Sequence, residues 1–351
     1  MRPIPSLQNN FEYTDLTEPM ILIPNVWGLT QQLGIFGVDR TTQESVTLEE
    51  ITKSFGLMED IHRGARHQVG RDYDRQMRTF AVPHFTYDDY ITPRDIQGKR
   101  AYGKQELETL DQVRMRKLER LRGTHAATME FARMHTLVTG KPYTPNNTVG
   151  GATGYDWYQE FGKTRFEVNF ELDTPTTNIL EKSELVYAHM QDEAYTGGVV
   201  GDVIAICSPE FFSKLISHPT VVEAYKYYAS QPQILRERLR ARGFDARYRE
   251  FYFGNVLYIE YRGGFQGRPG GEKRRYVPAG EAVFIPGSGT EDLFKTFFAP
   301  ASKFEHVNTP GEESYAFEYV DPKGEFLEIN SETNFINVLM YPQLVVKGKA
   351  A

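Results

Sequence analysis

The 351-residue chain lacks the features that mark several common classes of protein. It has one cysteine, Cys207, so neither an internal disulfide nor a cysteine-based metal site can form within the chain. That cysteine lies in an apolar run, which favours a packed, inert thiol over a reactive one. No run reaches the roughly 18 apolar residues that a membrane span requires. The most apolar early stretch, residues 19–29, is short and follows no basic segment, so we expect a soluble chain without a signal peptide.

An excess of positive charge is also missing. The chain has 40 Lys and Arg against 47 Asp and Glu, a formal net charge of −7. A protein that holds nucleic acid through its phosphates needs the opposite balance, so we expect no general binding of polyanions. Internal repeats and low-complexity tracts are absent as well. The apolar content of 40% is that of an ordinary globular protein with a real core.

Catalytic and metal-binding constellations are scarce. The segment IPGSGT at residues 285–290 follows a predicted strand but lacks the Lys-Ser/Thr end of a phosphate-binding loop, so a plain turn is the simpler interpretation. His62 and His67 have no third ligand beside them, and the spacing of His125 and His135 places them on different faces of one helix. We predict no catalytic residue, no cofactor and no metal site, and we interpret the chain as a protein without enzymatic activity.

What the sequence does contain is one unusually long helix, predicted over residues 105–138. This stretch has no proline, and its apolar residues recur at spacings of mostly three and four, as on one face of an amphipathic helix. Gly140 and Pro142 follow it as a helix end and a helix breaker. At about 1.5 Å per residue the helix would reach on the order of 50 Å, longer than a compact domain needs. The apolar positions are Leu107, Leu110, Val113, Leu118, Leu121, Met129, Ala132 and Met134.

Two segments before this helix are predicted to be extended. Residues 1–38 contain four prolines and no sustained hydrophobic period, which is typical of an arm that needs another surface to order it. Residues 45–48 and 77–85 read as two strands, and the polar, turn-rich segment between them contains three glycines. We interpret this region as a long two-stranded excursion. A ribbon of two strands is marginally stable in water, so we expect it to rest on a neighbouring subunit.

The second half of the chain alternates short strands and helices. Its clearest signal is a buried strand at residues 202–207, followed by Ser208 as helix N-cap and Pro209 as the first residue of a helix through residue 216. Residues 321–324 have the Pro and Gly positions of a tight turn. A further helix is predicted at residues 179–190, and further strands at 164–172, 255–261, 281–285, 314–320, 325–329 and 335–346.

An arm, a projecting ribbon and a long helix are unexpected in a monomeric protein. They expose backbone edges and aromatic surface that a neighbouring copy would cover, so we infer an assembly subunit. Basic side chains and one tyrosine of the excursion, together with basic side chains of the loop at residues 263–275, are the predicted intersubunit contacts. These are Arg63, Arg66, Arg71, Tyr73 and Arg75 in the excursion, and Arg268, Lys273, Arg274 and Arg275 in the loop.

The order and spacing of several segments resemble the major capsid proteins of tailed bacteriophages, in particular the group of the lambda capsid protein E. No single motif carries the resemblance, which runs over most of the chain. The segments are YDDYITPRDIQGK, the helix end LVTGK, GDVIAICSPEFFSKL, GNVLYIEYRG, YVPAGEAVFIPGS and DPKGEFLEINSETNFINVLMYPQLVV.

The resemblance implies an α+β protein with the Hong Kong 97-like capsid fold. In that fold the long helix at residues 105–138 is the spine helix of an L-shaped shell tile. The implied divisions are an N-arm at 1–38, an extended β-hairpin E-loop with its flanks at 39–100, a peripheral domain at 101–198, an axial domain at 199–305 and return strands of the peripheral domain at 306–351.

The resemblance also implies the function. The chain would assemble with itself into pentamers and hexamers of an icosahedral head that encloses double-stranded DNA without sequence-specific binding. A portal protein, a separate scaffold and in some cases a decoration protein would be its partners, and assembly would take place in the host cytoplasm. Two alternatives stay open at this point: a cellular encapsulin-type compartment, and an enzyme built on the strand–helix unit at residues 203–216.

Overall fold

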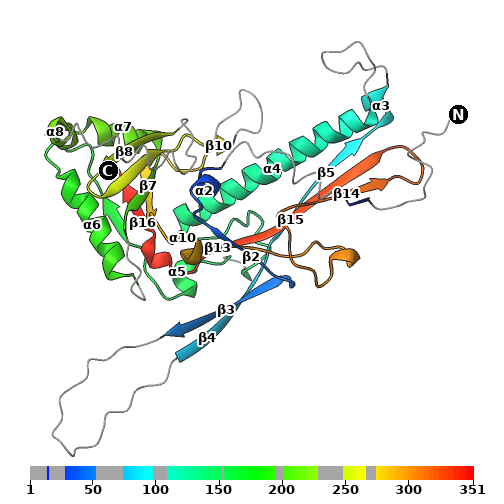
Figure 1. The fold of residues 1–351 in the computed structure, drawn as a ribbon, viewed down its shortest axis with the longest axis horizontal. Helices are drawn as coiled ribbons and strands as arrows, with labels where there is room; N and C mark the ends of the chain where they lie inside the picture. Colours follow the sequence, from blue (N-terminus) through cyan, green and yellow to red (C-terminus); the bar gives the residue numbers. More distant parts are fainter. Residues whose placement is uncertain are drawn as a thin grey trace, which may run out of the picture.

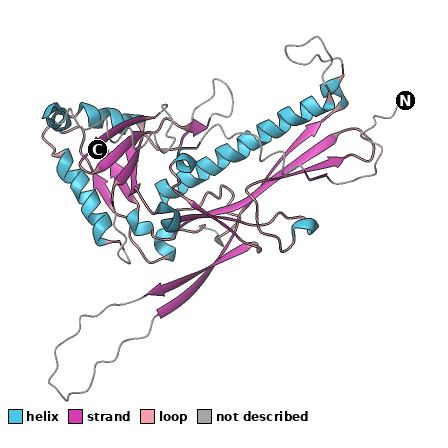
Figure 2. Ribbon diagram, viewed as in Figure 1, coloured by secondary structure: helices cyan, strands magenta, loops and turns pink. Residues whose placement is uncertain are grey.

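The structure, a computed structural model, describes residues 14–15, 28–52, 74–97, 109–151, 154–194, 201–227, 248–265 and 274–351. Within these ranges the strands form two six-stranded sheets and two two-stranded ribbons (Figure 1). The sheets lie toward opposite ends of the molecule, and helices cover both of them (Figure 2). The α+β class predicted from the sequence is therefore confirmed.

The first sheet, which we call the long sheet, is organised around β15 (Leu327–Leu339). The first half of β15 pairs with β14 on one side and β5 on the other, whereas its second half pairs with β13. β2 extends this second half as a parallel neighbour of β13, and β1 extends the first half beside β14. The other strands are β1 (Thr14–Asp15), β2 (Gly37–Arg40), β5 (His84–Ile91), β13 (Phe294–Phe298) and β14 (Tyr315–Val320).

The second sheet, which we call the compact sheet, has the order β6-β16-β12-β7-β9-β8. Every residue of β7 and β9 is buried, as expected of central strands that are covered on both faces. Helices α6 (Ile179–Asp192), α7 (Pro209–Ser217) and α8 (Pro219–Tyr227) pack around it (Figure 1). Its strands are β6 (Glu167–Asn169), β7 (Val203–Cys207), β8 (Arg249–Phe253), β9 (Val256–Glu260), β12 (Glu281–Pro286) and β16 (Val346–Lys349).

The predicted long helix is present as α4 (Leu110–Thr139), and it runs along the long sheet beside β5 and β15 (Figure 1). Its apolar stripe faces the protein: Val113, Leu118 and Leu121 are all buried. The helix begins at a capping box, in which the Thr109 side chain accepts from the backbone N–H of residue 112. Residues 105–108 of the predicted range lie outside the described residues.

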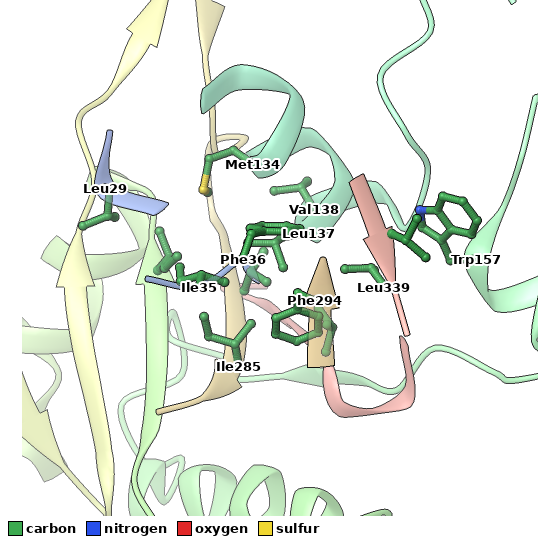
Figure 3. Packing of buried hydrophobic residues seen from close by; sticks show 14 of the residues in the cluster. Leu29, Ile35, Phe36, Met134, Leu137, Val138, Trp157, Ile285, Phe294 and Leu339 are labelled. Atoms are coloured by element: carbon green, nitrogen blue, oxygen red, sulfur yellow. The ribbon is translucent and has the colours of Figure 1, made fainter. Parts of the chain in front are cut away.

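One hydrophobic core joins the two sheets. It combines side chains from α4, from both sheets and from the segment that precedes β2 (Figure 3). Leu29 in the short helix α2 (Leu29–Gln32), Ile35 and Phe36 belong to this core and are buried. The sequence had placed them in the arm at residues 1–38, but the last eleven residues of that range are part of the body.

Two local predictions are confirmed in detail. The Ser208 side chain caps α7 by accepting from the backbone N–H of Phe211 at 3.3 Å, and Pro209 is the first helical residue. At the turn between β14 and β15, the N–H of Gly324 donates to the carbonyl of Asp321 at 2.8 Å, and Gly324 has φ of 73°. In both places the interacting residues are three positions apart, so the local sequence is sufficient to predict the helix cap and the turn.

Four strand predictions are wrong in extent. The single strand at 77–85 is two strands, because Pro83 separates β4 (Asp74–Ala81) from β5 and supplies no N–H to a ladder. The predicted strands at 325–329 and 335–346 are also misdivided: β15 runs unbroken to Leu339, a 3-10 turn η4 (Pro342–Leu344) follows, and β16 enters the other sheet. The strand at 164–172 shortens to β6.

The predicted domain ranges do not follow the sheets at every boundary. β6 and α6 fall in the range 101–198 and β16 in the range 306–351, yet all three belong with the compact sheet. β13 falls in the range 199–305 but belongs to the long sheet. Both sheets combine segments that are distant in sequence, so continuous ranges cannot separate them. The division into peripheral and axial domains stays a prediction.

Candidate assembly surfaces

The predicted two-stranded excursion is a ribbon that projects away from both sheets (Figure 1). Strands β3 (Ser45–Thr52) and β4 (Asp74–Ala81) pair antiparallel without a bulge, from Ser45 opposite Ala81 to Thr52 opposite Asp74. Within the described residues neither strand has a second neighbour, so both outer backbone edges are free of strand partners. A pair of free edges is a natural site for contact with another chain.

The base of the ribbon is fixed to the body by an aromatic cluster. Phe80 is 1% exposed and meets Tyr155 and Trp157 edge-on, with ring centroids 5.2 and 5.1 Å apart. The Tyr155 hydroxyl accepts from the backbone N–H of Ala81 at 3.0 Å. Arg78, two residues farther out on β4 than Phe80, donates to the carbonyl of Glu160. The ribbon therefore leaves the body in a defined direction.

One face of the ribbon is exposed. Met77 is 62% exposed, and the hydroxyls of Thr47 and Thr79 face each other at 3.0 Å on the same surface. Arg75 forms an ion pair with Glu49 across the two strands at 2.5 Å. Since both partners are largely exposed, this pair contributes little to folding stability. The polar and apolar groups of this part are available to a partner.

The structure places three of the nine predicted contact residues. Arg75 lies on the exposed part of the ribbon. Arg274 and Arg275 form the short strand β11 (Arg274–Arg275), which pairs with β10 (Gly264–Phe265) beside the C-terminal half of α4. Arg275 forms an ion pair with Glu210, and the Arg274 guanidinium lies 5.0 Å from the Phe131 ring centroid. Both are exposed but already have partners within the chain. The other six residues, Arg63, Arg66, Arg71, Tyr73, Arg268 and Lys273, lie outside the described residues.

A series of polar contacts ties α4 to the long sheet. Lys117 pairs with Asp89 of β5 at 2.6 Å, and Arg114 pairs with Glu318 of β14 at 2.7 Å. Deeper along the helix, the ring Nε2 of buried His125 lies 2.9 Å from Ser331 Oγ on β15. Burial lowers the pKa of His125 to about 4, so this ring is neutral at neutral pH. These contacts fix the helix along the sheet without burying a net charge at His125.

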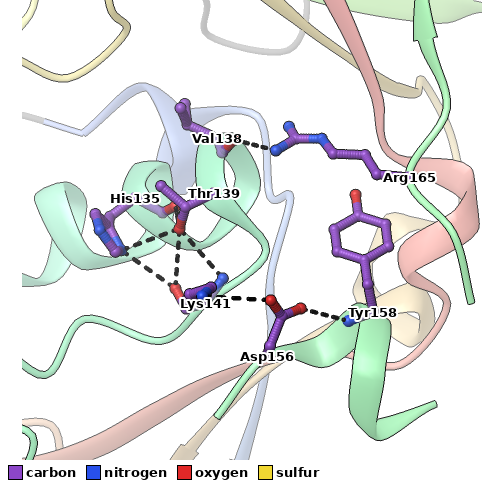
Figure 4. A network of polar contacts seen from close by, with 7 residues as sticks. All are labelled: His135, Val138, Thr139, Lys141, Asp156, Tyr158 and Arg165. Carbon is purple, nitrogen blue, oxygen red and sulfur yellow. Dashed lines mark hydrogen bonds and ion pairs between the residues drawn. The ribbon is translucent and has the colours of Figure 1, made fainter. Parts of the chain in front are cut away.

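The C-terminal end of α4 carries a second polar network (Figure 4). Gly140 takes the left-handed conformation with φ of 76°, and Arg165 donates to the carbonyls of Val138 and Leu137. A cation at a helix C-terminus satisfies free carbonyls and complements the helix dipole. The Tyr158 hydroxyl in turn donates to the carbonyl of Val345 at 3.2 Å, and this bond links the helix end to the segment that enters the compact sheet.

Two charged residues on α4 are buried where the helix crosses between the sheets. The Glu130 carboxylate accepts from the backbone N–H and the hydroxyl of Thr30 and, at 2.8 Å, from the Tyr261 hydroxyl. It thereby joins α2, α4 and the end of β9. Burial and the nearby Glu130 raise the pKa of Tyr261, so the phenol stays protonated and remains a donor. Arg133, one turn later, donates from Nε to Thr296 at 3.2 Å.

Sequence reasoning missed Glu130 and Arg133. On the helical pattern, charged residues are expected on the solvent face, and nothing in their spacing distinguishes them from the exposed charges of the same helix. It also missed Phe304, which is fully exposed on the 3-10 turn η3 (Phe304–His306) between β13 and β14. A lone aromatic in sequence is normally a core residue, so only the structure identifies it as a surface feature.

The structure describes Cys207 and residues 285–290, the two segments whose sequence raised the question of chemistry. No group of three or more His, Cys, Asp or Glu side chains there could hold a metal ion. Cys207 is fully buried, and burial raises the pKa of its thiol well above the ordinary value, as expected of a packed residue. Residues 285–290 end β12 and lead into the short helix α10 (Thr290–Leu293). None of the helices described here is long and apolar enough to cross a membrane.

Comparison with known proteins places the chain in a family. It matches the family model described as phage major capsid protein E over residues 12–350. A curated relative, the major capsid protein of Salmonella phage Felix O1 (isolate Felix O1-VT1), is 28% identical over 367 residues, and the alignment covers 98% of each chain.

Solved structures of phage capsid proteins have a fold similar to that of this chain. A capsid-protein chain from a prophage of E. coli CFT073 has a TM-score of 0.55 at 14% identity and covers 91% of this chain and 92% of its own length. The mature capsid of bacteriophage PhiM1 has a TM-score of 0.51 at 11% identity, with coverage of 90% and 85%. The fold is thus the Hong Kong 97-like capsid fold predicted from the sequence. With a family match over nearly its whole length, the chain belongs to the phage major capsid protein E family.

Proposed function

We propose that this protein forms the wall of a phage head by assembling with copies of itself into pentamers and hexamers around double-stranded DNA. The observation that carries the proposal is the match to the major capsid family over residues 12–350. The full-length relative of Salmonella phage Felix O1 is itself a major capsid protein, and the two chains have nearly the same extent. The proposed role is structural.

The shape of the subunit supports self-assembly. The ribbon and the outer part of the long sheet extend away from the shared core, so a large share of the chain can contact neighbours (Figure 1). Standard protein interfaces bury about 1,600 Å² in total. In a closed shell each subunit meets several neighbours at once, so contacts that are weak singly become strong together. We expect the ribbon to serve as the E-loop that overlaps a neighbouring subunit.

The remaining partners follow from the kind of particle. A head that is filled and emptied through one vertex needs a portal protein, and a shell of defined size generally needs a scaffold, which we expect to be a separate chain here. A decoration protein would add to the outer surface. The DNA would be enclosed without sequence-specific contacts, in keeping with the net charge of −7. Assembly would occur in the host cytoplasm.

The test is to express the chain and size the product by sedimentation and electron microscopy. We expect large closed shells or capsomers, either alone or on addition of a scaffold. A solitary, compact species that persists at high concentration under assembly conditions would contradict the proposal. Particles purified from phage-producing cells should contain DNA and one distinct portal vertex, whereas an encapsulin-type compartment would have neither.

A further inference from the structure

The C-terminal half of α4 is the part of the helix that contacts both sheets. The other half packs in a separate cluster with β5, β14 and β15 of the long sheet. Met134, Leu137 and Val138 belong instead to the core between the sheets (Figure 3), which also contains Ile204 of β7 and Ile259 of β9. Apolar contacts are not directional, so this core specifies the angle between the sheets less strictly than hydrogen bonds do.

Two chain connections pass from one sheet to the other close to the C-terminal end of α4. One leads from β12 through α10 to β13, and the other leads from β15 through η4 to β16. They lie side by side, since the N–H of Met340 donates to the carbonyl of Leu293 at 2.9 Å. Tyr158 donates to the carbonyl of Val345 in the second connection. Connections that lie together in this way can act as a hinge between two bodies.

A buried hydrogen-bond network joins the sheets at Glu130, eight residues before Val138 and therefore about 12 Å from this hinge along the helix. Its carboxylate accepts from the hydroxyl of Tyr261, which directly follows β9 of the compact sheet, at 2.8 Å. It also accepts from the backbone N–H of Thr30 at 3.2 Å and from the Thr30 hydroxyl. Thr30 lies in α2, which leads into β2 of the long sheet. We call these contacts the Glu130 network.

The Glu130 network is shielded from water and continues into the long sheet. Glu130 is 3% exposed and Tyr261 is 1% exposed. Burial and the nearby Glu130 raise the pKa of Tyr261, so the phenol remains a hydrogen-bond donor. One turn along α4, Arg133 donates to Thr296 of β13 at 3.2 Å, and the Thr296 hydroxyl donates to Asn337 of β15 at 2.8 Å. A directional contact that far from a hinge restricts rotation about it.

We propose that the Glu130 network holds the two sheets at one angle and thereby helps to set the curvature of the shell. The part that concerns curvature rests on the proposed function, since it needs assembled copies of the chain. In a shell, the rotation between the contact surfaces of a subunit decides how a ring of subunits closes. A fixed angle between the sheets favours one particle size, whereas a variable angle allows several. Glu130 and Tyr261 are buried, so they are positioning residues and do not touch a neighbour.

Two tyrosines at the same strand provide a matched pair of substitutions. Tyr261→Phe removes only the hydroxyl that links the compact sheet to Glu130. Tyr258→Phe on β9 is the control, because its hydroxyl is equally buried and lies 2.7 Å from Ser183 Oγ on α6, within the compact sheet and its helices. Each variant loses one buried hydrogen bond, so both should lower the melting temperature of the unassembled subunit to a similar extent.

The angle between the sheets can be measured in the full-length, unassembled subunit by pulsed electron paramagnetic resonance. Spin labels on Met115→Cys of α4 and Val222→Cys of α8 report on the two ends of the molecule, because both side chains are exposed, at 49% and 40%. Cys207 is fully buried and should take no label. Tyr261→Phe should broaden the distribution of label-to-label distances, whereas Tyr258→Phe should leave it unchanged. An unchanged distribution in Tyr261→Phe, or equal broadening in both variants, would overturn the inference.

Electron microscopy of assembled particles tests the consequence for the shell. Tyr261→Phe should give a wider range of particle diameters than the wild type, and Tyr258→Phe should give the wild-type range. Tyr261→Phe particles of uniform wild-type diameter would overturn the link between the Glu130 network and curvature, and would leave the proposed function intact. If the wild-type chain forms no particles, the proposed function and the curvature part of the inference both fail. The label distances still decide in that case whether the network fixes the angle.

Discussion

The ribbon and α4 with its sheet are both long elements, but they are stabilised in different ways. The ribbon contacts the body at one end, where Phe80 packs among Tyr155 and Trp157, and its outer part has exposed side chains and free edges. α4 is packed along its length, and its polar groups find partners on β5, β14 and β15. We therefore propose that α4 belongs to the body of the subunit and that the ribbon belongs to the contact between subunits.

The comparison also separates contacts that stabilise the folded subunit from contacts that would stabilise the assembled particle. Along α4, side-chain contacts within the chain stabilise the folded subunit and are present whether or not it assembles. On the outer part of the ribbon, the exposed side chains have few contacts within the chain, so we expect them to contribute more to assembly than to folding. We therefore expect substitutions on the outer ribbon to reduce particle formation, and substitutions along α4 to reduce folding stability.

The largest expected effect comes from removing the outer ribbon. Deleting residues 55–74 should leave a folded subunit with an unchanged thermal transition, because the deletion removes none of the side chains of the aromatic base, Phe80, Tyr155 and Trp157. The same variant should form no closed shells, as judged by sedimentation and electron microscopy. A matched control replaces the range with a Gly/Ser linker of equal length, which keeps the spacing but not the contacts. Normal particles from the deletion would refute the E-loop assignment.

Breaking the base of the ribbon should instead reduce folding stability. Phe80→Ala removes a ring that is 1% exposed and should lower the free energy of unfolding by about 3–5 kcal/mol. The measurement is urea denaturation of the unassembled subunit. Met77→Ala, three residues away and 62% exposed, is the control and should change this free energy by less than about 0.5 kcal/mol. Similar losses from the two variants would mean that the ribbon is not fixed at its base.

Two glycine substitutions, one inside α4 and one at its C-terminal end, should change the free energy of unfolding in opposite directions. Gly140→Ala places a Cβ 2.3 Å from the Tyr158 ring in a backbone conformation with φ of 76°. The strain and the clash together should cost about 2–4 kcal/mol of unfolding free energy. Gly123→Ala, in the helix interior with open space around it, should stabilise the protein by about 0.5–1 kcal/mol. Thermal melts of both variants measure the difference, and a stable Gly140→Ala protein would contradict the assigned helix end.

The smallest effect is a pH dependence within α4. The pKa of His125 falls from 6.5 to about 4 because the ring is buried, so the unfolded chain binds its proton first. The stabilising contribution is complete above pH 6.5 and decreases as the pH falls toward 4, reaching a loss of roughly 2 kcal/mol at pH 5. His125→Gln should flatten this part of the pH profile of the unassembled subunit. An unchanged profile would show that His125 is not buried as a neutral ring.

The local sequence accounts for those features whose signals lie within a few residues. The long apolar stripe, its end at Gly140, the Ser208-Pro209 helix start and the turn at residues 321–324 were all predicted, because each depends on neighbours in the chain. The order of such segments also sufficed to identify the capsid fold. Pairing between β3 and β4 was predicted too, because the two strands flank a single excursion.

Contacts between distant residues were decided by the tertiary structure alone. The sequence did not divide residues 335–346 between two sheets, and it did not predict the parallel pairing of β2 with β13. Nor could it distinguish buried Glu130 and Arg133 from the exposed charges of the same helix, or exposed Phe304 from core aromatics. Burial depends on which surfaces meet, and that is set by packing across more than a hundred residues of sequence, whereas helix and turn signals are set by neighbours along the chain.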